Sequence, residues 1–307
     1  IHGGWMAAAL PASAAMLEGR RRVMTEVSDF SETLAGKGMV PLAKMQTTAA
    51  WQAAFGVTEF TLYYNRTKRP AREYRAYNDF VGRLNALLRE ARPEPEVILY
   101  YPIYDLWADY LPVGEPLKIG TQPQRAQRLA NSFMRLGQRL ATSQQPFLIA
   151  DHEVLAAAEV RDSRLWVRDH AFHTLVLPDG AELPEAASRV VAKFRDARGR
   201  IVRDDMKGEP ARFDGENETG ASGRLQPASD RIILGRFAGG SREILLLANV
   251  GTQPYKGEVS VRSAGTWCRA DPATGEVKRE EASGQNGITV SLPANATIVL
   301  VGPAGGR

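Results

Sequence analysis

The strongest constraint on this chain is a change in hydrophobic patterning that begins near residue 206. Up to residue 205, apolar runs of strand length alternate with segments whose apolar residues recur at helical spacing. Residues 231–302 lose the helical spacing and show short runs rich in β-branched and aromatic residues. The polar residues between them, rich in Gly, Glu and Pro, are typical of a linker. The chain therefore combines an α/β part (1–205), a linker (206–230) and an all-β part (231–307).

The first 91 residues predict two parallel strands that are joined and flanked by helices. Strand-like runs occupy residues 22–26 (RVMTE) and 57–64 (VTEFTLYY). Helical spacing is found at 6–18, 42–55 and 74–91. This order implies parallel strands with crossover helices, but two strands are too few for a stable parallel sheet. The segment therefore needs partners that this sequence does not supply.

Residues 92–205 predict a small doubly wound, flavodoxin-like domain. Continuous apolar strands at 97–101 (VILYY) and 146–150 (PFLIA) are separated by an amphipathic helix at 125–142. Shorter helix-like and strand-like segments, including a strand at 165–167, continue the alternation. Glycine-rich phosphate-binding patterns are missing from its loops, so we do not expect an independent catalyst here.

The last region predicts an antiparallel β-sandwich. Seven short strands follow one another, with turn signals between them. Gly239-Gly240 and Asn286-Gly287 suit two-residue hairpins, and residues 271–275 (DPATG) suit a turn led by proline.

Composition excludes several classes of function. The 39 Lys and Arg residues stand against 35 Asp and Glu residues and are mostly scattered, which argues against a nucleic-acid interface. One cysteine cannot form an intramolecular disulfide or a Cys₄ zinc site, and we expect no metal site. No apolar run approaches the roughly 20 residues of a membrane helix. The chain opens at Ile1 without the ordered regions of a signal peptide, so we expect a fragment of a longer chain.

Glu26 is the leading candidate for chemistry. It ends a predicted parallel strand, and catalytic residues of (β/α)₈ barrels project from that end. Such a carboxylate can serve as nucleophile, general acid or general base in glycoside hydrolysis, although a loop or capping glutamate fits the same pattern. Tyr63, Tyr64 and Asn65 end the next strand, where they can bind a sugar or be ordinary strand residues. Asp29 and Glu32 follow Glu26 as further carboxylates.

A second candidate loop follows the strand at 97–101. It contains Asp105 and Trp107, and doubly wound folds bind ligands at the carboxyl ends of their strands. We expect both residues to bind substrate. A free-standing flavodoxin-like protein would instead hold a phosphate or flavin here.

The order of motifs resembles the C-terminal part of bacterial glycoside hydrolases with a (β/α)₈ TIM barrel, particularly the α-L-rhamnosidase type. It is also similar to multidomain β-galactosidases, in which an amidotransferase-like domain and a β domain follow the barrel. The motifs that carry the resemblance are GVTEFTLYY, VILYYPIYDLW, LIADHEVL, HTLVLP, LLLANV and RADPATGEV.

The resemblance implies that residues 1–91 contain barrel strands seven and eight, with Glu26 as the strand-seven glutamate. Strands one to six and the second catalytic carboxylate are missing, so we expect this chain alone to be inactive. We expect no cofactor. The resemblance leaves open whether the longer enzyme binds a calcium ion. The implied substrate is an oligosaccharide or polysaccharide, and the implied location is periplasmic or secreted.

The leading hypothesis is hydrolysis of a terminal glycosidic bond, for example of an α-L-rhamnoside. The alternative is a noncatalytic carbohydrate-binding or scaffold region. A truncated barrel would expose apolar residues, among them Val57, Phe60 and Leu62, and so favour oligomerisation or aggregation.

Overall fold

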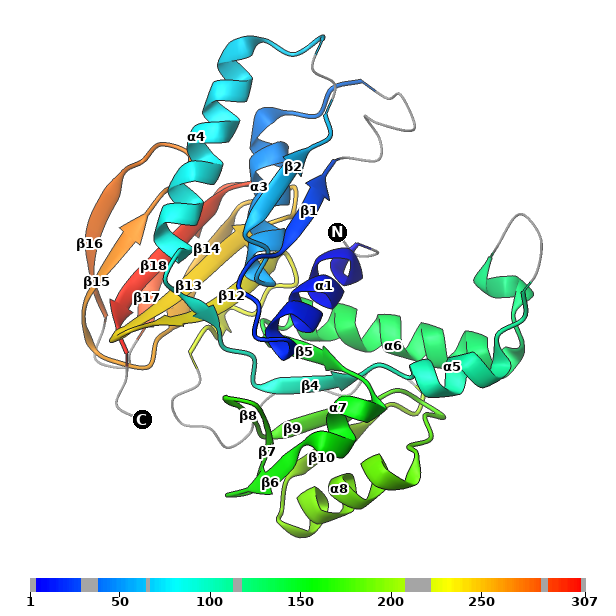
Figure 1. Cartoon of the computed structure of the whole chain (residues 1–307). Coiled ribbons are helices and arrows are strands. Elements are labelled where there is room, and N and C mark those ends of the chain that lie inside the picture. Colours follow the sequence, from blue (N-terminus) through cyan, green and yellow to red (C-terminus); the bar gives the residue numbers. More distant parts are fainter. Residues whose placement is uncertain are drawn as a thin grey trace.

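The computed structural model describes residues 4–28, 38–64, 67–112, 118–207, 222–282 and 287–304 (Figure 1). Asn65, Asp29 and Glu32 lie outside these residues. The fold is mixed, with separate parallel and antiparallel sheets.

The N-terminal region has the predicted order of helices and strands. It consists of α1 (Trp5–Leu17), β1 (Met24–Val27), α3 (Leu42–Ala54), β2 (Glu59–Leu62) and α4 (Ala71–Leu88). β1 and β2 pair in parallel, with Glu26 opposite Thr61 and Val27 opposite Leu62. They form a two-stranded sheet in the described part of the chain, and the barrel end stays a prediction.

The middle region contains a four-stranded parallel sheet in the order β10-β9-β4-β5. Its strands are β4 (Val97–Tyr100), β5 (Phe147–Ala150), β9 (Thr174–Leu177) and β10 (Arg200–Arg203). Helices α1 and α6 (Gln124–Thr142) lie on one face, and α7 (His152–Ala157) and α8 (Glu185–Asp196) lie on the other (Figure 1).

Burial on both faces explains the continuous apolar run of β4. Leu99 packs with Leu136 of α6 on one face, whereas Ile98 packs with Leu155 of α7 and with Phe194 of α8 on the other. Successive side chains of a strand point to opposite faces, so a sheet covered on both sides needs apolar residues at every position.

One strand that the sequence predicts within the parallel α/β region lies in a separate antiparallel sheet. Residues 165–167 lie in β7 (Arg164–Val167), which pairs antiparallel with β6 (Glu159–Arg161) and β8 (His170–Phe172) in a sheet of its own. Asp162 and Ser163, at φ 50° and 58°, form a two-residue turn between β6 and β7. A turn of this length can connect only antiparallel strands, which removes β7 from the parallel sheet.

The C-terminal region is an antiparallel sandwich of two sheets. The larger sheet has the order β16 (Val277–Ala282), β15 (Gly265–Ala270), β18 (Thr297–Pro303), β13 (Arg242–Asn249), β12 (Ile232–Gly239) and β3 (Arg92–Pro93). The smaller one has the order β11 (Leu225–Gln226), β14 (Tyr255–Ser260) and β17 (Gly287–Leu292). β16 and β17 pair in different sheets, so the predicted hairpin at Asn286-Gly287 is wrong.

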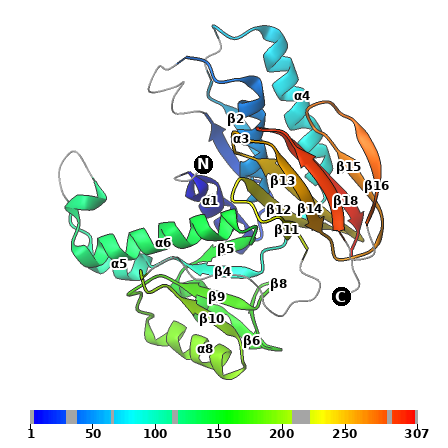
Figure 2. The same ribbon diagram turned by 180° about the vertical axis from the view of Figure 1, so that it is seen from behind.

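The larger sheet is also covered on its outer face. Leu245 and Leu247 of β13 face the smaller sheet, whereas Ile244 and Leu246 join the core that contains residues of α3 and α4. Figure 2 shows α3 and α4 beside the larger sheet. The N-terminal region is therefore docked on the sandwich. Within that shared core Val57 is only 2% exposed, so its predicted exposure is wrong.

Candidate active site

The two faces of the β1–β2 sheet have different environments. On one face, Val27 is fully buried, and the Thr25 hydroxyl donates a hydrogen bond to Gln52 Oε1 of α3. Glu26 lies between these residues in the strand, so its side chain points to the opposite face. Glu26 and its register partner Thr61 are exposed. The carboxylate of Glu26 therefore faces away from the helix layer.

The other acidic residue in these two strands lies at the opposite end of the sheet. Glu59 begins β2 opposite Met24, and its Oε1 accepts a hydrogen bond from Arg22 Nε at 2.5 Å. This contact raises the pKa of the exposed Arg22 guanidinium, because the carboxylate stabilises the charged form. Glu26 is thus the carboxylate at the carboxyl end of the described sheet.

Tyr63 lies at the same end as Glu26. Its backbone N donates to Val27 O at 3.0 Å, which extends the strand pairing by one residue. The Tyr63 side chain is 57% exposed. Because successive side chains of a strand point to opposite faces, it lies on the face of Thr61 and Glu26 and not on that of Leu62. A ring in this position can stack on the apolar face of a sugar.

Tyr64 points the other way and is only 4% exposed. The guanidinium of the equally buried Arg69 lies 6.0 Å from the centre of its ring. Arg69 also donates to Glu73 Oε2 at 2.7 Å and to Val40 O at 2.9 Å. This placement suits support of the strand end better than contact with a sugar.

Asp105 and Trp107, two residues apart in α5 (Ile103–Asp109), face in different directions. Asp105 is 2% exposed, pairs with Arg125 Nη2 and accepts from Glu182 N at 3.2 Å. Arg125 Nη1 also donates to Asp109 Oδ2 at 2.6 Å, and these hydrogen bonds raise the pKa of Arg125. Asp105 therefore anchors α5, whereas the Trp107 side chain is 68% exposed.

Charged groups occupy the carboxyl ends of β9 and β10, where doubly wound folds hold cofactors. Ser132 of α6 donates to Asp204 Oδ2 at 2.5 Å and accepts from Asp179 N at 2.8 Å. Arg135 pairs with Asp204, and Arg128 Nε lies 3.3 Å from Asp179 Oδ2. These charged and hydroxyl groups are therefore in contact with one another. The described residues also contain no cluster of His, Cys, Asp and Glu that could hold a metal ion.

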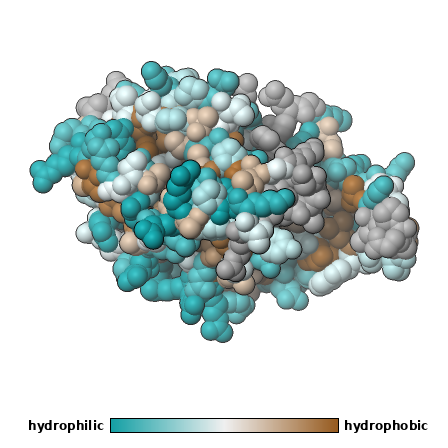
Figure 3. Space-filling view, turned by 90° about the horizontal axis from the view of Figure 1, so that it is seen from above, coloured by the Kyte–Doolittle hydropathy of each residue, from teal (hydrophilic) through white to brown (hydrophobic). Residues whose placement is uncertain are grey.

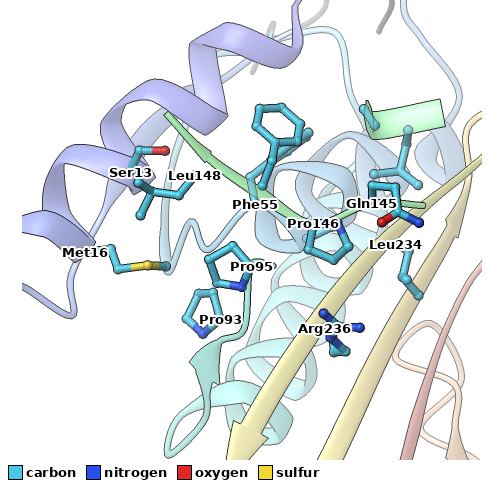
Figure 4. Close-up of a pocket in the computed structure, with 14 residues that line it drawn as sticks. Ser13, Met16, Phe55, Pro93, Pro95, Gln145, Pro146, Leu148, Leu234 and Arg236 are labelled. Atoms are coloured by element: carbon cyan, nitrogen blue, oxygen red, sulfur yellow. The ribbon is translucent and has the colours of Figure 1, made fainter. Parts of the chain in front are cut away.

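A cavity of about 20 Å³ lies where the three regions meet (Figure 4). Its lining includes Ser13 of α1, Phe55, Pro95, Gln145 and Arg236 of β12. This volume fits about one water molecule, so the cavity cannot hold a sugar.

Arg236, 2% exposed, belongs to a network of partly buried ion pairs beside that cavity. Its Nη2 lies 2.5 Å from Glu96 Oε1, while Arg262 contacts Glu94 at 3.0 Å and Glu96 at 3.2 Å. Burial of Glu96 favours its neutral form, but Arg236, His173 and Arg262 outweigh it and hold its pKa below the usual 4.5. Arg236 and Arg262 come from the sandwich, so the network joins it to the segment that leads into β4.

The sequence pattern did not indicate this network, because its charges are spread from Glu94 to Arg262 with no periodicity. The same holds for His152, which the structure brings beside Tyr104 and Trp107.

No described helix has the length and apolar character required to cross a membrane.

No protein-family model matches this chain. No curated protein sequence matches it either. Solved structures do match it. The rhamnosidase from Novosphingobium sp. PP1Y superposes with a TM-score of 0.62 at 13% identity, over 99% of this chain and 33% of that one. The α-L-fucosidase isoenzyme 2 from Paenibacillus thiaminolyticus superposes with a TM-score of 0.55 at 12% identity, over 99% of this chain and 64% of that one. The β-galactosidase from Bacillus circulans sp. alkalophilus superposes with a TM-score of 0.50 at 11% identity, over 83% of this chain and 52% of that one.

These structures show that the chain has a fold found within glycoside hydrolases. The predicted resemblance is therefore confirmed at the level of fold, and the rhamnosidase type stays a prediction. The chain spans about a third of the matched rhamnosidase and just under two thirds of the matched fucosidase.

Proposed function

We propose that this chain is the C-terminal part of a glycoside hydrolase and that Glu26 is one of its two catalytic carboxylates. Residues 1–91 would supply the last two strands of a (β/α)₈ barrel, residues 92–205 a doubly wound domain and residues 231–307 the sandwich. The full enzyme would cleave a terminal glycosidic bond in an oligosaccharide or polysaccharide, with an α-L-rhamnoside as the first substrate to test.

The observation that carries this proposal is the orientation of Glu26. It lies near the carboxyl end of β1, on the face opposite the one that packs on α3. In a (β/α)₈ barrel the helices surround the strands, so a side chain that points away from the helices points into the barrel. Catalytic carboxylates of barrel enzymes occupy this end of the strands.

Tyr63 and Tyr64 would have different roles beside Glu26. Tyr63, exposed on the same face, would stack on the sugar. Tyr64, buried against Arg69, would hold the end of β2 in position for that contact. Asn65 follows directly in the sequence and would donate to sugar hydroxyl groups.

The second carboxylate would come from another barrel strand, because Glu59 lies at the other end of the sheet and is paired with Arg22. A separation of about 5–5.5 Å between the two carboxyl groups would predict retention of configuration. A separation of roughly 6.5–9.5 Å would predict inversion, because a water molecule must fit between them.

The test is Glu26→Gln in the longer enzyme, assayed on 4-nitrophenyl glycosides of rhamnose, fucose and galactose. We expect kcat to fall by about a hundredfold or more, as for loss of a general acid or base. Glu59→Gln is the matched control, because it removes a carboxylate from the other end of the sheet. An unchanged kcat in Glu26→Gln removes Glu26 from the mechanism.

The sandwich-based alternative, a noncatalytic carbohydrate-binding module, has less support. The outer face of its larger sheet, a surface on which such a module could bind sugar, is covered by α3 and α4.

A further inference from the structure

Three aromatic rings gather at the carboxyl edge of the four-stranded sheet. Tyr104 and Trp107 lie on one face of α5, which follows β4, and His152 begins α7, which follows β5. β4 and β5 are adjacent and parallel, with Tyr100 opposite Ala150, so the two helices start side by side. The ring centre of His152 lies 5.2 Å from that of Tyr104 and 6.3 Å from that of Trp107.

The rings form a surface that is open to solvent. Trp107 is 68% exposed and Tyr104 is 47% exposed. A tryptophan usually buries most of its ring, because the ring supplies a large apolar area. His152 Nδ1 is buried without a hydrogen-bond partner among the described residues.

This ring cluster rests on rigid supports. The buried carboxylate of Asp105 ties α5 to Arg125 of α6 and to the backbone of Glu182. Asp151 Oδ1 accepts hydrogen bonds of 3.0 Å from the backbone N of Glu153 and of Val154, which caps α7. A surface that is ordered before binding loses less conformational entropy when a ligand arrives.

The same contacts select the chemical class of the ligand. The Asp151 carboxylate occupies the amino end of α7, where a phosphate would otherwise bind. Asp105 and Asp109 are both paired with Arg125. What remains is a set of rings with polar edges, which fits the apolar faces and hydroxyl groups of a neutral sugar.

We propose that Tyr104, Trp107 and His152 form a binding platform for a neutral glycan chain, on a different sheet from Glu26. The proposal relies on the proposed function only for the choice of a carbohydrate as ligand. The platform would hold a polymer while another part of it reacts, so it would affect polysaccharides and leave small aryl glycosides unaffected.

A protein partner is the competing occupant. The chain after α5 carries exposed Leu111 and Ile119, and Figure 3 shows hydrophobic side chains at this end of the molecule. Both residues lie beyond the end of α5, whereas Tyr104 and Trp107 lie within it. The test must therefore separate a glycan from a second protein chain.

The experiment is native electrophoresis of the 307-residue chain in gels that contain β-1,4-galactan, xyloglucan or galactomannan. The gel is run toward the cathode because the formal net charge is +4. We expect at least one neutral polymer to slow the chain. Trp107→Ala and Tyr104→Ala should each raise the apparent Kd about tenfold, whereas Trp107→Phe should retain most of the binding.

Two controls locate the effect. Tyr110→Ala removes an exposed ring just after α5, and Leu111→Ala removes the exposed apolar side chain next to it; both should bind as the parent chain does. The platform is overturned if no neutral polymer slows the chain, or if Trp107→Ala binds normally. It is also overturned if light scattering shows that Trp107→Ala dissociates an oligomer. Hydrolysis of aryl glycosides by the longer enzyme tests Glu26 separately.

Discussion

Gly137 of α6 packs directly against the indole ring of Trp5 in α1, and a Cβ atom at position 137 would lie 2.2 Å from Trp5 Cη2. Trp5 is 1% exposed and contacts the rings of Phe133 and Phe147, each with a centroid distance of 5.5 Å. The glycine therefore permits α1, from the N-terminal region, to dock on the sheet of the middle region.

Gly137→Ala should lower the free energy of unfolding by about 1–3 kcal/mol, because the indole must move out of a packed core. Urea denaturation monitored by tryptophan fluorescence measures this change. Gly82→Ala in α4 is the matched control: no atom lies within 4 Å of its added Cβ, so it should stabilise by about 0.5–1 kcal/mol. Equal effects of the two substitutions would contradict the packing argument.

Gly235→Ala should loosen the contact between the sandwich and α3. An added Cβ on β12 would lie 2.6 Å from Ala54 Cα, which is backbone and cannot rotate away. We expect a loss of about 1–3 kcal/mol in thermal denaturation. Gly239→Ala, in the same strand, would meet its nearest atom at 3.5 Å and should have a smaller effect.

The ion-pair network of Glu94, Glu96, Arg236 and Arg262 predicts loss of stability in acid. The folded-state pKa of Glu96 is below its usual 4.5, so its contribution is complete above about pH 4.5 and is lost as pH falls toward the folded-state value. Glu96→Gln should lower stability at pH 7 and reduce the further loss between pH 5 and pH 3. Urea midpoints at each pH provide the measurement. Glu185→Gln, at an exposed helix pair, should leave the pH profile unchanged.

Asp105→Asn should destabilise the chain by about 1–3 kcal/mol, because it breaks a buried charge-assisted contact with Arg125. Asp109→Asn, which removes the more exposed partner of the same arginine, should cost less. Thermal melts of the two variants decide the order. If Asp109→Asn costs more, Asp105 is not the anchor of α5.

Hydrogen exchange should differ between parts of the N-terminal region. The amides of α3 lie in the core shared with β12 and β13, so residues from Met45 to Ala53 should exchange slowly. β1 pairs only with β2 in the described chain and should exchange faster. Mass spectrometry of the exchanged chain tests this. Equally fast exchange in α3 would show that the N-terminal region does not stay docked.

Local patterning predicted most elements. The run VILYY appears as β4 because both faces of that strand are buried. The strand predicted at 22–26 appears as β1 at Met24–Val27, but only Val27 of it is buried. The shift from helical spacing to short strands likewise marks the start of the sandwich. The position of Glu26 at a strand end follows from the same pattern.

Contacts between distant segments could not be predicted in this way. Arg92 and Pro93 pair with β12 because the chain passes the edge of the sandwich before it enters the parallel sheet. A turn of two non-glycine residues at positive φ moved β7 into an antiparallel sheet. The sequence predicted both Asp105 and Trp107 as ligand residues, yet helical spacing turns one into the protein and the other toward solvent.

The sequence by itself determined the kinds of element, their order and the residues that end the parallel strands, because these depend on neighbours within a few positions. The tertiary structure alone decided which faces are covered and which polar groups are paired. Those outcomes depend on segments such as α3 and β13, or Glu96 and Arg236, that are far apart in the chain and meet only when the apolar faces pack together. Burial then separates residues of the same chemical type into supports, such as Tyr64, and exposed groups, such as Tyr63.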